Sequence, residues 1–79
     1  MEVRAYVLIE TEVGKTKRVA ETIRGLQGVA LVDIVTGPYD VIVTIHAETM
    51  KDIGDLITEK IHPIIGVSRT VTCIAVMSS

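Results

Sequence analysis

The chain alternates between short apolar runs and segments in which apolar residues recur every three or four positions. The first pattern is typical of buried strands and the second of amphipathic helices. Gly28 and Pro63 stand where the two helical patterns end. We predict, in chain order, a strand at 3–9, a helix at 14–26, strands at 29–36 and 41–46, a helix at 49–61 and a strand at 67–77.

This order of elements is that of the split βαβ, or ferredoxin-like, arrangement. Right-handed crossovers place both helices on one face of a four-stranded antiparallel sheet. The second helix has a capping signal, because Thr49 is followed three residues later by Asp52. We therefore predict an α+β, ferredoxin-like βαββαβ sandwich formed by a single domain over residues 1–79.

The sheet face away from the helices is predicted to be apolar as well. The strands at 3–9 and 41–46 carry apolar residues on both sides. In the strand at 29–36, one side carries Ala30, Val32 and Ile34 and the other carries Val29, Leu31 and Val35. Monomers seldom expose an apolar patch larger than roughly 300–600 Å². We therefore predict a homodimer in which the free faces of two sheets pack together.

Composition and charge narrow the functional classes. The 79 residues are 48% hydrophobic, include no Trp or Phe, and carry a formal net charge of −2. A nucleic-acid-binding domain normally shows a basic stripe or aromatic stacking platforms, so we expect no direct binding of nucleic acid. No apolar run is long enough to span a membrane, and the first residues do not resemble a signal peptide. We expect a soluble, cytoplasmic protein without a membrane partner.

Catalytic and metal-binding patterns are not found in the sequence. No nucleophile has a local base, and there is no phosphate loop, nucleotide-binding glycine pattern or carboxylate pair. His46, His62 and Cys73 are too few and too scattered for a zinc site, which needs about four such ligands. We expect no enzyme activity, no catalytic residue, no metal and no cofactor. Cys73, inside the last strand, is expected to be a buried reduced thiol.

The tetrad Gly37-Pro38-Tyr39-Asp40 between two apolar runs is the first candidate for a binding site. Gly and Pro favour a tight turn, which would hold Tyr39 and Asp40 in fixed, outward positions. Two interpretations are open at this point. Asp40 either completes the turn by accepting hydrogen bonds from nearby backbone N–H groups, or binds a small polar ligand.

Thr70 and Thr72 are the second candidate. They are two residues apart on the last predicted strand and so share one of its faces. Threonine is also a good strand former, so they serve either strand formation or ligand binding.

The two candidates together resemble a known family. Gly37-Pro38-Tyr39-Asp40 before Val-Ile-Val, followed by Gly66-Val67 and Thr70-Val71-Thr72, are similar to paired signatures of the Lrp/AsnC effector-binding domain. The Lrp/AsnC proteins are the leucine-responsive and asparagine-responsive (feast/famine) transcription regulators, and the resemblance covers essentially the whole chain. Domains of this family share the order of elements above, dimerise through their sheets, form rings of dimers and bind small amino acids between dimers.

The resemblance implies an amino-acid-binding regulatory and oligomerisation module, with a free amino acid as effector and full-length regulators as further candidate partners. It implies that Asp40 holds the ammonium, and that the rest of the pocket comes from Gly37, Pro38, Tyr39, Thr70 and Thr72. Family regulators also carry an N-terminal helix-turn-helix domain, to which no residue here corresponds, so the chain looks like a stand-alone effector domain. Cys73 stands where the family has an aromatic residue.

The alternative is a small enzyme or trafficking protein on the same fold. Acylphosphatase-like chemistry would need an Arg near residues 11–14, and a metallochaperone would need a pair of cysteines. The sequence offers neither.

Overall fold

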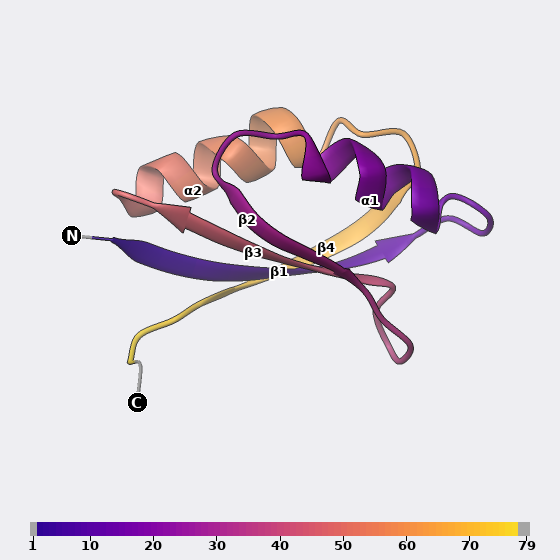
Figure 1. Ribbon diagram of the computed structural model, residues 1–79, viewed down its shortest axis with the longest axis horizontal. Coiled ribbons are helices and arrows are strands. Elements are labelled where there is room, and N and C mark those ends of the chain that lie inside the picture. The colour runs from indigo at the N-terminus through magenta and orange to yellow at the C-terminus, as the bar shows by residue number, and fades with distance from the viewer. Residues whose placement is uncertain (1, 78–79) are drawn as a thin grey trace.

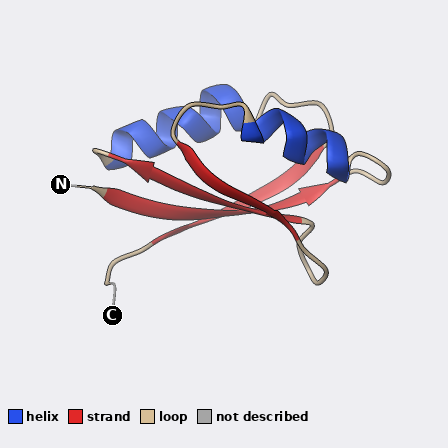
Figure 2. Cartoon of the chain, viewed as in Figure 1, coloured by secondary structure: helices blue, strands red, loops and turns tan. Residues whose placement is uncertain are grey.

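The computed structural model describes residues 2–77, which form two layers (Figure 1). One layer is an antiparallel four-stranded sheet, and both helical segments lie on the same face of it (Figure 2). The elements are β1 (Val3–Thr11), α1 (Thr16–Arg24), β2 (Val29–Ile34), β3 (Val41–Ala47), α2 (Met50–Leu56), the π-helical turn η1 (Ile57–Ile61), which continues α2, and β4 (Val67–Ile74).

The predicted order of elements and the ferredoxin-like fold are confirmed. The strands lie in the order β2-β3-β1-β4, so β1 and β3 are central and β2 and β4 are edge strands. The capping prediction is also confirmed, because Thr49 Oγ1 accepts a hydrogen bond of 3.1 Å from the Asp52 N–H.

Several element ends differ from the prediction. α1 is shorter than predicted at both ends. The predicted helix at 49–61 changes to π-type hydrogen bonding at Ile57, and the His62 N–H donates to the Ile57 carbonyl at 2.8 Å. β4 ends at Ile74 rather than at residue 77, although the Ala75 N–H still donates to the Arg4 carbonyl at 2.9 Å.

The core lies between the helices and one face of the sheet. Alternate residues of each central strand point into it, as the period of two requires. The fully buried residues are Ala5, Val7 and Ile9 of β1, Val41, Val43 and Ile45 of β3, Val19, Ala20 and Ile23 of α1, and Ile61 of η1.

An irregularity in β2 changes which of its side chains face the core. Val29 pairs with Ile45 and Leu31 pairs with Thr44, so β2 carries one extra residue between two successive positions of β3. The prediction that Val29 and Leu31 share one face is wrong, because such a bulge reverses the alternation. Val29 packs against the core, whereas Leu31 lies on the free face and is 55% exposed.

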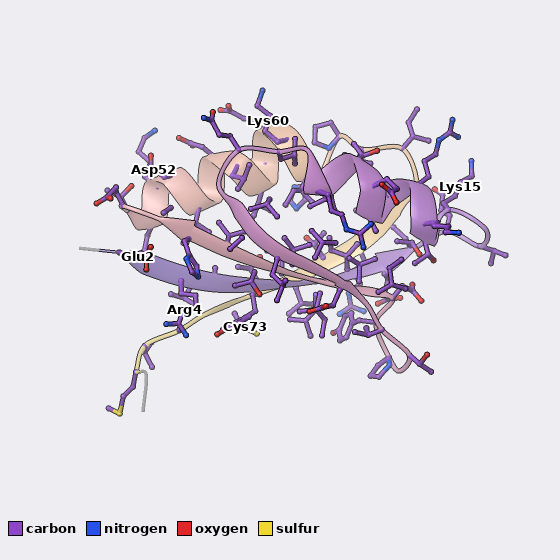
Figure 3. The ribbon with its side chains drawn as sticks, viewed as in Figure 1. Glu2, Arg4, Lys15, Asp52, Lys60 and Cys73 are labelled. Carbon is purple, nitrogen blue, oxygen red and sulfur yellow. The ribbon has the colours of Figure 1, made fainter. Side chains whose placement is uncertain are left out.

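The sheet face away from the helices is apolar at its centre, as predicted. Ile42, Leu8 and Val71 form one row across β3, β1 and β4, and all three side chains are half-buried. We call this surface the open face. Figure 3 shows Arg4 and Cys73 on the side away from the helices. Cys73 is exposed, so the prediction of a buried thiol is wrong: it lies on an edge strand and on the uncovered side.

Candidate ligand-binding site

The predicted tetrad lies in an open connection, residues 35–40, that joins β2 to β3. A tight turn was predicted, but β2 ends at Ile34, and the Val35 N–H donates to the Asp40 carbonyl at 2.9 Å. The residues between these two therefore bulge out of the sheet. Gly37 has φ +151°, an angle that favours glycine. The Asp40 N–H donates to the Ile9 carbonyl at 2.9 Å and ties the connection to β1.

Asp40 is anchored through its side chain to the end of β1. Its Oδ2 accepts a hydrogen bond of 2.8 Å from the Thr11 N–H and one of 3.2 Å from the Thr11 hydroxyl. We predicted that this side chain would be free and outward, but it is half-buried. The interpretation of Asp40 as an acceptor of backbone N–H groups is thus correct in kind, but the donor belongs to β1 and not to the turn.

The second carboxylate oxygen of Asp40 remains available. Within residues 2–77, Oδ1 has no hydrogen-bond partner. Tyr39, next to it, is half-buried, and its hydroxyl likewise has no partner in the described part of the chain. Gly37 and Pro38 are exposed. The connection therefore offers an acceptor oxygen and a phenol hydroxyl on a backbone that is tied to β1.

The two threonines share one face, as predicted, and it is the face on the helix side of the sheet. Thr70 pairs with Ile9 and Thr72 pairs with Val7. The Thr70 hydroxyl lies 2.9 Å from His62 Nε2 at the end of η1. The sequence did not indicate this contact. Thr72 is exposed, because the helices do not cover this part of the edge strand.

The structure does not bring the two candidate groups into one pocket. Asp40 lies on the β3 side of β1 and the two threonines lie on its β4 side. Two strand spacings, about 10 Å, separate these sides. A hollow of about 460 Å³ between the start of β1 and residues 74–77 is lined by none of the predicted residues. Two others, of about 300 and 390 Å³, also lie elsewhere.

The charged groups near the sheet are mostly solvated. On the open face, the Arg4 guanidinium donates to the Tyr6 hydroxyl at 3.3 Å, and this hydrogen bond raises the pKa of Arg4. On α2, the pKa of Lys51 is raised by its hydrogen bond with Asp55 at 2.8 Å.

Across residues 2–77, no three His, Cys, Asp or Glu side chains lie close enough together to hold a metal ion. No helix in the same range is long and apolar enough to cross a membrane.

Comparison with known proteins adds independent information. The family model described as the Lrp/AsnC ligand binding domain matches residues 4–79. An uncharacterised helix-turn-helix-type transcriptional regulator of Pyrococcus furiosus is 38% identical over 74 residues, which cover 90% of this chain and 49% of that protein. The chain thus spans about half the length of the curated relatives it matches.

Two solved structures show how far the fold is shared. TTHA0845 from Thermus thermophilus superimposes with a TM-score of 0.93 at 32% identity, covering 98% of this chain and 96% of that one. AsnC of E. coli superimposes with a TM-score of 0.90 at 17% identity, covering 96% of this chain and 52% of that one. The first is similar along almost its whole length, and the second shares the fold.

Proposed function

Because the chain belongs to the Lrp/AsnC ligand-binding domain family, we propose that it is a regulatory module that binds a free amino acid and changes its assembly in response. The observation that carries this proposal is the state of Asp40. Its Oδ2 is held by Thr11, whereas Oδ1 has no partner within the described residues. A carboxylate oxygen in a fixed position is suited to a charge-assisted hydrogen bond from an α-ammonium group.

A complete site would need more than one chain. Asp40 and Tyr39 lie on one side of β1, and Thr72, whose hydroxyl has no partner within residues 2–77, lies on the other side. An amino acid is too small to reach both across β1. In the proposed site one chain supplies Asp40 and Tyr39, and another supplies a threonine hydroxyl for the ligand carboxylate. Occupancy of such a site stabilises the assembly, because the ligand binds only when both chains are present.

The open face supplies the surface for the smaller assembly step. Its central row of Ile42, Leu8 and Val71 is only half-buried in the single chain. A domain of this size buries only roughly 60–65% of the surface that its unfolded chain exposes, less than a larger domain does, so a second sheet over this face adds apolar burial that one chain lacks. We propose a sheet-to-sheet homodimer and, through the ligand sites, a larger ring of dimers.

The names of the relatives support the proposed regulatory role. The curated relatives that match this chain carry names of helix-turn-helix-type transcriptional regulators. The proposal is that the chain modulates such regulators in the cytoplasm, by joining their assemblies or by competing with them for the amino acid. It assigns neither catalysis nor direct DNA binding to residues 2–77.

The test is a thermal-shift screen with each protein amino acid, followed by native mass spectrometry with those that stabilise the chain. The Asp40→Asn variant keeps the shape of the side chain but lacks its charge, and the Glu59→Gln variant is the matched control at an exposed carboxylate of η1, away from the open face. We expect at least one amino acid to stabilise wild type and Glu59→Gln and to change the number of chains in the assembly, with both effects lost in Asp40→Asn. An equal response in Asp40→Asn, or no response in wild type, would overturn the proposal.

A further inference from the structure

We infer that Thr11 is a positioning residue for Asp40, and that it makes the site selective for a ligand with an ammonium group. The ligand part of this inference rests on the proposed function. The positioning part rests on the geometry alone, and concerns a residue that no sequence signature singled out.

The backbone of β1 directs the Thr11 N–H towards Asp40. In an antiparallel strand the backbone groups of alternate residues point to the same side. The Ile9 carbonyl accepts a hydrogen bond from Asp40 on the β3 side, so the Thr11 N–H, two residues later, points to this side as well. β3 begins at Val41, which pairs with Ile9, so no residue of β3 lies opposite Thr11. The Asp40 carboxylate takes the place of the missing strand carbonyl.

The hydroxyl groups of Thr16 and Thr11 both donate in the direction of Asp40. The Thr11 hydroxyl donates to Asp40 Oδ2 at 3.2 Å, and it lies 2.6 Å from the Thr16 hydroxyl. A hydroxyl has one proton, so Thr16 must be the donor in the bond between the two threonines. The chain of bonds therefore runs from Thr16 through Thr11 to Asp40. Each bond polarises the next in the same direction, which strengthens the hold on the carboxylate.

The backbone around Thr11 and Thr16 is held in place by its own hydrogen bonds. The residue after Thr11, Glu12, donates its N–H to the Gly66 carbonyl at 2.8 Å, and its own carbonyl accepts from the Lys15 N–H at 3.0 Å. Thr16 is the first residue of α1. The backbone on both sides of the hydroxyl pair is thus fixed by β3, by the loop before β4 and by α1. With Oδ2 committed to Thr11, Oδ1 is the oxygen presented to a ligand.

The positioning claim can be tested without any ligand. Nuclear magnetic resonance couplings between the Hα and Hβ protons of Asp40 report whether its side chain occupies one rotamer. We expect one rotamer in wild type and in Thr11→Ser, which keeps the hydroxyl, and couplings partly averaged between rotamers in Thr11→Val, which keeps the N–H but loses the hydroxyl. Thr58→Val, at an exposed helical threonine, is the matched control and should resemble wild type. A single rotamer in Thr11→Val would overturn the inference, whether or not the chain binds an amino acid.

The selectivity claim uses pairs of probes: each protein amino acid that stabilises wild type, and the carboxylic acid that lacks only its ammonium group. In calorimetric titrations we expect Thr11→Val to lose roughly three- to tenfold of the preference for the amino acid, the range for one hydrogen bond. Thr11→Ser should restore the preference. A purely structural role for Thr11 would lower both affinities equally and leave the preference unchanged, which would overturn the selectivity claim. A loss of binding in Asp40→Asn beside wild-type behaviour of Thr11→Val would sustain the proposed function and refute the role of Thr11.

Discussion

Replacing Asp40 by Ala is expected to destabilise the folded chain as well as to abolish ligand binding. The substitution removes the acceptor of two hydrogen bonds, from the Thr11 N–H at 2.8 Å and from the Thr11 hydroxyl at 3.2 Å. The Thr11 N–H then lacks an acceptor at a half-buried position, since β3 does not reach it. A hydrogen bond to a charged group contributes about 1.5–3 kcal/mol, and water can replace part of it at a half-buried site. We expect a total cost of about 1.5–3 kcal/mol.

Urea unfolding at one fixed protein concentration measures this cost, because the stability of an oligomer depends on concentration. Asp40→Asn keeps an oxygen that can accept the Thr11 N–H, and should lose about 1 kcal/mol or less. Glu59→Ala removes an exposed carboxylate from η1 and should stay within about 0.5 kcal/mol of wild type. If Asp40→Ala were as stable as Glu59→Ala, the bonds to Thr11 would contribute nothing and the reasoning about this anchor would be refuted.

Three further substitutions test the rest of the structure. Leu8→Asp places a charge in the central row of the open face, so we expect the free energy of dimer formation to weaken by about 3 kcal/mol or more. Sedimentation equilibrium should then show the 8.6 kDa monomer, and a dimer of unchanged affinity would exclude this face as the interface. At Gly66, φ is +106° and a Cβ would lie 2.9 Å from side-chain atoms of Lys15 and Val19, so Gly66→Ala should lower the free energy of unfolding in urea by about 2–4 kcal/mol. Gly14→Ala, where a Cβ would meet open space, should lower it by about 1 kcal/mol, and equal costs would contradict the packing. Thr49→Ala removes the cap of α2 and should lower the free energy of unfolding by about 1 kcal/mol, whereas Thr58→Ala should leave it unchanged. Equal melting curves for the two variants would show that the cap does not stabilise the chain.

Most of the fold could be predicted from local patterns. Val41, Val43 and Ile45 alternate along β3 and so share one face, and these residues are fully buried. The cap at Thr49 and the order of elements were also readable, because each depends on residues close together in the chain. The bulge in β2 was not predictable, since the residues on both sides of it are apolar and either alternation looks the same in the sequence.

The candidate site was predictable only in part. The sequence singled out Asp40, but its partner Thr11 is 29 residues away, and their contact depends on where β3 begins relative to β1. The one available signal was a threonine at the polar end of the first apolar run. The contact between Thr70 and His62 likewise depends on the path of the loop after η1, which no periodicity describes.

A crystal structure of the chain with the amino acid that stabilises it most tests the central claim most directly. The account predicts that the ammonium of the amino acid lies within hydrogen-bonding distance of Asp40 Oδ1, that Oδ2 keeps its bonds to Thr11, and that a second chain contributes to the same site. An amino acid bound away from residues 37–40, for example in the hollow beside residues 74–77, would contradict it.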